Sequence, residues 1–108
     1  MPQEITPREL AKRLANGHAV RLIDVRQPAE HQLAALPDST LIPLNELPQR
    51  SSEIKADADE MLVIYCHHGI RSLSAAAYLE RLGVRGVYSL AGGIEAWSLE
   101  VDPSVPRY

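Results

Sequence analysis

A single cysteine, Cys66, is the residue of this chain best suited to covalent chemistry. It opens a stretch, residues 66–72, that lies between an apolar run at 62–65 and an alanine-rich helical pattern at 72–82. A thiol placed there sits at a strand end beside a helix N-terminus, where backbone N–H groups and partial positive charge favour the thiolate. Because the thiolate is the nucleophilic form, this context predicts a catalytic nucleophile.

The alternative for a lone cysteine is a small buried hydrophobe without chemical function. Cys66 is followed by a turn that contains glycine and a cation, whereas an inert cysteine would sit within an apolar face. The strand–turn–helix context therefore favours the nucleophile.

The loop that follows the sulfur has the composition of a small anion site. Four residues separate Cys66 from Arg71, and a turn this short curls its N–H groups into a nest around the sulfur. Gly69 supplies a backbone position that can take a positive φ. Arg71 offers a positively charged fork for an oxyanion, and Ser72 can donate a hydrogen bond or cap the helix.

The two histidines of this loop have two interpretations. They can add partial positive charge to the site, or they can face the solvent. With both included, the predicted substrate-binding residues are His67, His68, Gly69, Ile70, Arg71 and Ser72.

Length and composition limit the classes of protein to which this chain can belong. Its 108 residues suffice for one domain with its own core, and a net charge of −3 argues against general nucleic-acid binding. One cysteine cannot form an internal disulfide, which fits a reducing cytoplasm. Residues 1–4 show no signal-peptide pattern, and the longest apolar stretch, at 61–66, is too short to span a bilayer. We expect a single cytoplasmic domain over residues 1–108 with no membrane partner.

Apolar runs and helix signals alternate along the chain. The expected strands cover residues 20–25, 41–42, 61–65 and 86–90, and the expected helices cover 7–15, 28–35, 44–50, 72–82 and 94–99. Residues 55–60 are expected to form a polar loop, and residues 102–108 an extended tail pinned by prolines. The alternation predicts an α/β fold with a mainly parallel sheet. Asp24 and Cys66 then lie at carboxyl ends of strands, where the functional crevice of such sheets is found.

Asp24 and Arg26 have two interpretations. They can support the loop from behind, or they can form an ordinary ion pair that fixes two segments. The second is favoured, since ion pairs more often organise structure than react.

The remaining histidines and the tryptophan give weaker signals. His18 and His31 are expected at the surface or in packing, and the histidines and Cys66 lack the ligand spacing of a structural zinc site. Ile94 and Trp97 are three positions apart, which is typical of core packing on one helix face.

Four motifs, in order and over nearly the whole chain, resemble those of the rhodanese (sulfurtransferase) family. Residues 66–71 resemble its Cys-x-x-Gly-x-Arg active loop. Residues 24–31 resemble its Asp-Val-Arg…Glu-(aromatic or His) element, 43–47 its Ile-Pro-Leu-x-x-Leu segment, and 92–97 its Gly-Gly-(apolar)-x-x-Trp signature. Residues 34–39 depart from the family's Gly-His-Ile-Pro-Gly-Ala, for which we expect a structural rather than a catalytic consequence.

The resemblance implies a fold and a reaction. The implied fold has three layers, with helices flanking a central, mainly parallel five-stranded sheet. In the implied reaction, the Cys66 thiolate takes the outer sulfur of thiosulfate, releases sulfite and holds the sulfur as a persulfide. A thiol, cyanide or a sulfur-carrier protein then removes it. Arg71 and the loop amides would hold the sulfonate end, with Asp24 and Arg26 behind them. No metal or organic cofactor is implied, because the sulfur is carried covalently.

Two other functions stay open. Cysteine-based phosphatases and arsenate reductases of related folds also attack an oxyanion with a thiolate, but the phosphatase loop is one residue longer. A non-catalytic rhodanese-like interaction module is the other, although the presence of both Cys66 and Arg71 argues against it. Residues 100–108 also resemble the C-terminus of rhodanese domains fused to sulfur-carrier adenylyltransferases, which suggests a carrier protein as acceptor.

Overall fold

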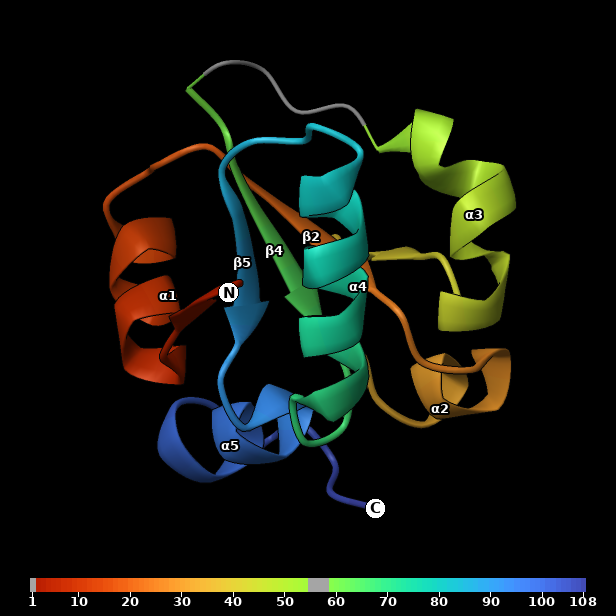
Figure 1. The fold of residues 1–108 in the computed structure, drawn as a ribbon. Helices are drawn as coiled ribbons and strands as arrows, with labels where there is room; N and C mark the ends of the chain where they lie inside the picture. The colour runs from red at the N-terminus through yellow and green to blue at the C-terminus, as the bar shows by residue number, and fades with distance from the viewer. Residues whose placement is uncertain (1, 55–58) are drawn as a thin grey trace.

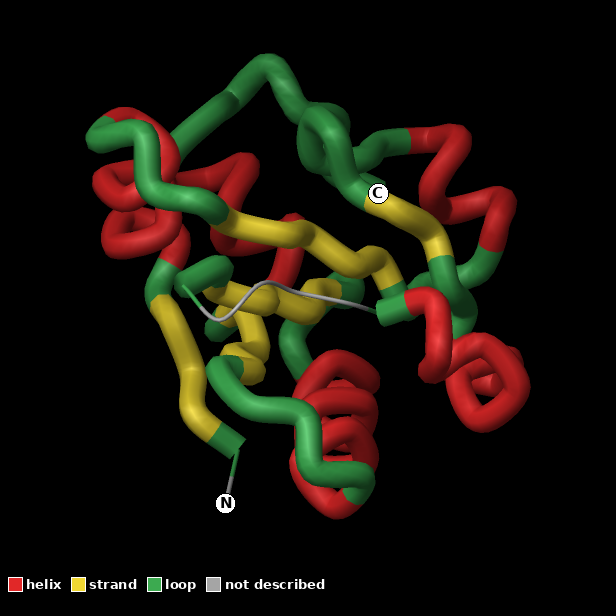
Figure 2. The backbone as a smooth tube through the Cα atoms, turned by 90° about the horizontal axis from the view of Figure 1, so that it is seen from above, coloured by secondary structure: helices red, strands yellow, loops and turns green. Residues whose placement is uncertain are grey.

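All strands in the described part of the chain, residues 2–54 and 59–108 of the computed structural model, belong to one parallel sheet. The sheet has five strands in the order β1-β5-β4-β2-β3, with helices around them (Figures 1 and 2). The strands are β1 (Gln3–Ile5), β2 (Val20–Asp24), β3 (Thr40–Leu41), β4 (Met61–Tyr65) and β5 (Val87–Leu90). The predicted α/β class with a five-stranded parallel sheet is thus confirmed.

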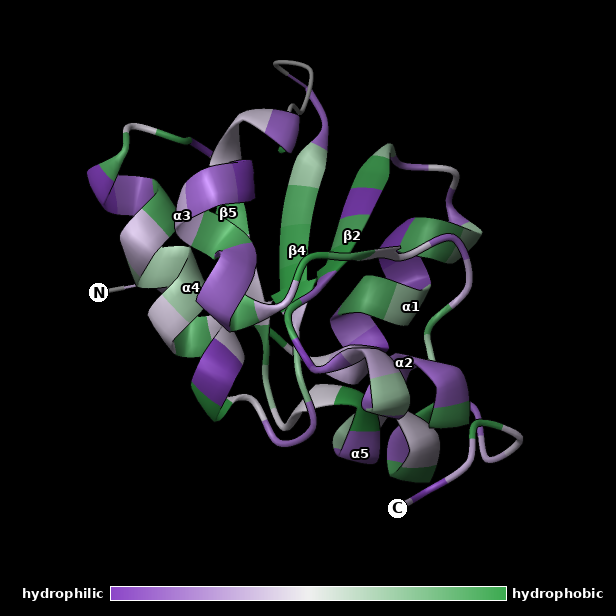
Figure 3. Cartoon of the chain, turned by 90° about the vertical axis from the view of Figure 1, so that its right-hand side faces the viewer, coloured by the Kyte–Doolittle hydropathy of each residue, from purple (hydrophilic) through white to green (hydrophobic). Residues whose placement is uncertain are grey.

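Helices cover both faces of this sheet. They are α1 (Pro7–Ala15), α2 (Pro28–Leu33), α3 (Leu47–Arg50), α4 (Ile70–Arg81) and α5 (Gly93–Glu100), with single 3₁₀ turns at Leu44–Glu46 and Ser51–Glu53. Helices α3 and α4 lie on one face, and α1 and α5 on the other (Figure 3). Prolines at the starts of α1, α2 and α3 suit a position whose N–H needs no partner within the helix.

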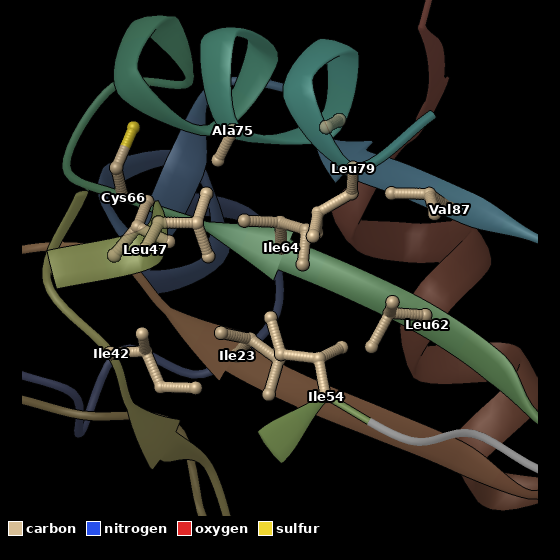
Figure 4. Packing of buried hydrophobic residues seen from close by; sticks show 12 residues of the cluster. Ile23, Ile42, Leu47, Ile54, Leu62, Ile64, Cys66, Ala75, Leu79 and Val87 are labelled. Carbon is tan, nitrogen blue, oxygen red and sulfur yellow. The ribbon is translucent and has the colours of Figure 1, made fainter. Parts of the chain in front are cut away.

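Strand β4 forms the centre of the core because both of its faces are covered. Leu62 and Ile64 pack with Cys66 against α4, as Figure 4 shows, whereas Val63 and Tyr65 belong to the cluster on the opposite face. This alternation is the period of two expected of a strand. All five are almost fully buried, and full burial of an aliphatic side chain contributes about 1.5–3 kcal/mol.

Helix α4 begins two residues earlier than predicted. Its N-cap is Gly69, with φ of 98°, so Ser72 lies within the first turn and does not cap the helix. The buried face is Ser72, Ala75, Ala76 and Leu79. Leu73 and Ala77 beside this face are only half-buried, and Leu82 is 52% exposed.

Other boundaries differ where local signals are weak. Strand β1 was not predicted, because only Ile5 of its three residues is buried. Helix α2 ends at Leu33 rather than at residue 35, and the helix predicted at 44–50 is divided into a 3₁₀ turn and α3. Residues 55–58 of the predicted polar loop lie outside the described residues.

The parallel topology brings the functional candidates to one edge. The strands end at the lower edge of the sheet in Figure 1, and α2, α5 and the last residues of the chain lie below this edge. Residues 102–108, predicted to be extended, include a turn closed by the bond from the Val105 N–H to the Asp102 carbonyl. Val105 is buried in the core against α5, which anchors this segment before it reaches the sheet edge.

Candidate active site

The Cys66 sulfur lies at the end of β4, beside the first turn of α4 (Figure 4). It accepts hydrogen bonds from the backbone N–H groups of Gly69, at 3.1 Å, and Ser72, at 3.3 Å. The residue is only 1% exposed. The turn therefore folds over the sulfur as the sequence predicted, and two N–H donors are already aimed at negative charge on that atom.

A pair of buried serine hydroxyls extends from the sulfur into the protein. The Cys66 thiol lies 3.5 Å from Ser72 Oγ, and Ser72 Oγ lies 2.7 Å from Ser89 Oγ. Both serines are fully buried. Sequence reasoning found Ser72 but missed Ser89, because a polar residue in a strand carries no local signal for a partner on a helix seventeen positions away.

The beginning of α5 supports the loop from below. The Ile94 N–H donates to the Cys66 carbonyl at 2.9 Å, and the Glu95 N–H donates to the His67 carbonyl at 3.1 Å. These N–H groups are left without partners at a helix start, and the loop carbonyls satisfy them. Gly92 and Gly93 take φ of 74° and 63°, and Gly93, which lacks a Cβ, leaves room for this approach.

Arg71 does not stand free at the loop. Its Nη1 and Nη2 donate to the two carboxylate oxygens of Glu30, at 2.7 and 2.9 Å. The bidentate pair is partly buried, with Arg71 35% and Glu30 20% exposed. The sequence placed Glu30 in a motif but gave it no role, so the occupied guanidinium is a finding of the structure.

Tyr108 connects the Arg71–Glu30 pair to a second ion pair, which Arg26 forms with Asp24. Its hydroxyl donates to Glu30 at 2.8 Å and accepts from Nη1 of Arg26 at 2.7 Å. Arg26 is fully buried and forms a bidentate pair with Asp24, with bonds of 2.9 and 2.8 Å. Asp24 and Arg26 therefore form an ion pair, as favoured from sequence, and Tyr108 and Glu30 connect this pair to Arg71.

The loop histidines lie within a stack of rings. His67 stacks on His68 and on Tyr108, with both ring centroids 3.9 Å away. Burial and the neighbouring His68 lower the pKa of His67, which favours its neutral form. Ile70 is 75% exposed and makes the rim of the loop apolar on that side.

The other sequence candidates take structural positions. His31 bonds Asp24 at 2.7 Å, His18 is exposed, and Ile94 and Trp97 pack in the core. Within residues 2–54 and 59–108, no three His, Cys, Asp or Glu side chains gather closely enough to hold a metal ion. No helix in that same part of the chain is long and apolar enough to cross a membrane.

The segment that departs from the family pattern is held by Tyr65. The Leu36 N–H donates to the tyrosine hydroxyl at 3.1 Å, and Ser39 Oγ lies 2.8 Å from the same oxygen. Because Tyr65 is on β4, directly before Cys66, this segment is attached to the strand that leads into Cys66. These contacts tie the segment to the sheet.

A buried cysteine on an N–H-lined loop at the carboxyl edge of a parallel sheet defines a class of nucleophilic α/β domains. The chain belongs to the rhodanese-like domain family, whose model matches residues 6–100. The family resemblance predicted from the motifs is thereby confirmed.

Relatives in this family include sulfurtransferases of the same length. The chain is 44% identical to a sulfurtransferase of Allochromatium vinosum over 105 residues, covering 97% of this chain and 96% of that protein. It is 42% identical to the thiosulfate sulfurtransferase GlpE of Pseudomonas syringae pv. syringae, covering 84% and 83% of the two chains. The solved structure of the human single-domain sulfurtransferase TSTD1 matches with a TM-score of 0.78 and 28% identity, over 93% and 98% of the two chains. These relatives indicate a sulfurtransferase.

Proposed function

We propose that this protein moves a sulfane sulfur from thiosulfate or another donor to a thiophilic acceptor through a persulfide on Cys66. The observation that carries the proposal is the sulfur itself, which accepts two backbone N–H bonds within a loop of four residues between Cys66 and Arg71. The name of the Pseudomonas relative supports thiosulfate as a donor.

In the loading step, the thiolate electron pair of Cys66 forms a bond to the outer sulfur of thiosulfate. The S–S bond of thiosulfate breaks, and its electron pair leaves with sulfite. The products are the persulfide anion Cys66–S–S⁻ and sulfite, so charge balances without a proton or a redox partner. The Gly69 and Ser72 N–H groups are placed to stabilise negative charge on the sulfur throughout.

In the unloading step, a thiol, cyanide or a sulfur-carrier protein takes the outer sulfur and regenerates the Cys66 thiolate. The sulfur is carried covalently, so the proposal requires neither a metal nor an organic cofactor. The exposed Ile70 at the loop rim leaves an apolar contact open to a protein acceptor.

Intact-mass measurement tests this function. Incubation with thiosulfate should add one sulfur atom to the protein, and cyanide should remove it as thiocyanate. Cys66→Ser should abolish both, and unchanged turnover in that variant would refute the mechanism. Cysteine-dependent release of phenol from an aryl phosphate would instead indicate a phosphatase, and no loading from any sulfane donor would indicate a non-catalytic module.

A further inference from the structure

Glu30 is held in place beside the active loop by four donors. Two come from Arg71, one from the Tyr108 hydroxyl, and the fourth is the Gln27 N–H at 3.0 Å. The last bond belongs to the capping box at the start of α2. Bonds from three separate segments of the chain leave this carboxylate little freedom to move away when a substrate arrives.

The same bonds keep Glu30 ionised. The hydrogen bonds from Arg71 are the main cause that lowers the pKa of Glu30 to about 2. Near neutral pH the carboxylate therefore carries a full negative charge, and that charge faces the cation that the sequence assigned to anion binding.

The other charges around the loop are also arranged in pairs. Asp24 pairs with Arg26 behind Tyr108, and Glu95 pairs with Arg107 at 2.7 Å beside the start of α5. The ring of His67, which stacks on His68 and Tyr108, favours the neutral form because its pKa is lowered. A substrate anion consequently meets N–H dipoles and balanced pairs, not the surplus positive charge predicted from Arg71 alone.

We propose that Glu30 is a specificity-determining residue that makes this site prefer sulfane-sulfur donors with one negative charge over donors with two. This inference rests on the proposed sulfur transfer through Cys66. A carboxylate repels a dianion about twice as strongly as a monoanion at the same distance, so its effect depends on donor charge. Specificity then comes from a repulsive group as much as from attractive ones.

The chemistry of a singly charged donor is the same as that of thiosulfate. With a thiosulfonate, R–SO₂–S⁻, the Cys66 thiolate bonds to the outer sulfur, and the S–S electron pair leaves with the sulfinate R–SO₂⁻. The persulfide anion on Cys66 is again the product, and charge balances. Benzenethiosulfonate and thiosulfate therefore differ by one negative charge. They also differ in size and polarity, so the test compares how each variant changes the ratio between the two donors.

The experiment compares the wild type with Glu30→Gln, which keeps the size of the side chain and an oxygen that can accept from Arg71. With cyanide as acceptor, Glu30→Gln should raise the ratio of kcat/KM for thiosulfate to kcat/KM for benzenethiosulfonate roughly threefold to tenfold. The change should appear mainly in KM. An unchanged ratio between the two donors, or a ratio that shifts toward benzenethiosulfonate, would overturn the proposal.

Glu53→Gln is the control. Glu53 also makes a bidentate pair with an arginine, Arg50, but at the surface and away from the loop. In Glu53→Gln, the ratio of kcat/KM for thiosulfate to kcat/KM for benzenethiosulfonate should equal that of the wild type. A general loss of stability would lower both activities together, so it would not change the ratio.

Anion binding separates this inference from the proposed function. In a Cys66→Ala background, Glu30→Gln should lower the dissociation constant of sulfate roughly threefold to tenfold by calorimetry and that of methanesulfonate less. Equal effects on both anions would overturn the role of Glu30, whether or not the protein turns over. Absence of sulfur loading on wild-type Cys66 would overturn the proposed function instead.

A measurement on the wild type alone does not depend on the variant folding. If the Glu30 carboxylate repels a dianion more strongly than a monoanion, added salt should screen that difference, and kcat/KM for thiosulfate should rise relative to kcat/KM for benzenethiosulfonate. If the ratio of kcat/KM for thiosulfate to kcat/KM for benzenethiosulfonate falls or stays constant as ionic strength rises, the proposal is contradicted.

Discussion

A side chain at position 93 would place its Cβ 2.5 Å from the carbonyl oxygen of Cys66. Gly93 also has φ of 63°, a conformation that costs other residues about 1–2 kcal/mol. The glycine therefore serves two purposes. It allows the backbone turn into α5, and it lets the Ile94 N–H reach the carbonyl of Cys66.

Gly93→Ala should destabilise the fold by at least about 2 kcal/mol, because backbone strain and a clash with loop carbonyls add together. Urea unfolding measures this loss. Gly17→Ala is the control, since Gly17 has φ of 75° with open space around it and should show the cost of backbone strain alone. Equal losses in the two variants would mean that the close approach to Cys66 contributes nothing.

Arg71→Ala should reduce kcat/KM for thiosulfate by a factor that corresponds to about 1.5–3 kcal/mol, the value of a charge-assisted hydrogen bond. The variant also leaves Glu30 without its bidentate partner, so an unpaired carboxylate faces the donor. Adding Glu30→Gln to Arg71→Ala should recover part of the loss. Steady-state kinetics with cyanide as acceptor measures both effects. If Arg71→Ala keeps the activity of the wild type, Arg71 does not take part in binding the donor.

The stability of the protein in acid should depend on Glu30. Its pKa in the folded protein is about 2, below the ordinary 4.5, mainly because Arg71 donates to it. A group whose folded pKa is depressed stabilises the fold fully above its unfolded pKa, and this contribution is lost as pH falls from about 4.5 through about 2. The loss should reach about 2–3 kcal/mol. Glu30→Gln should flatten the decline of the unfolding free energy over this range, and an identical slope would contradict the assignment.

Arg26→Ala should lower the free energy of unfolding by about 3–5 kcal/mol, because Asp24 would remain buried without its cation. A substitution at the surface should cost less than this. The double variant Asp24→Ala with Arg26→Ala should cost less than the sum of the single variants. Chemical denaturation of the three variants gives the coupling. Additive losses would show that the buried pair does not act as a unit.

The sequence predicted those features that depend on neighbours along the chain. Helix α1 spans the predicted residues 7–15, where Thr6 closes a capping box with Glu9, and the apolar run at 61–65 is the central strand. Gly69 adopts the predicted positive φ. Each of these follows from local conformational preference or from a hydrophobic pattern within a few residues.

The parts that could not be predicted depend on contacts between distant segments. Tyr108 reaches Arg26 across 82 positions, and Arg71 reaches Glu30 across 41. No periodicity or spacing in one sequence encodes such distances. Strand β1 was missed for a related reason, because its pairing with β5 supplies the order that its own polar residues do not indicate.

The bonds from α5 to the loop carbonyls of Cys66 and His67 have a thermodynamic consequence. The loop is shaped when the protein folds, so each catalytic cycle begins with its N–H groups already aligned and needs no reordering when sulfur arrives or departs. In the proposed sulfur transfer, Cys66 therefore acts from a loop that the α5 bonds have already shaped. The conformational entropy of assembling the site is paid once, at folding, and not at every turnover.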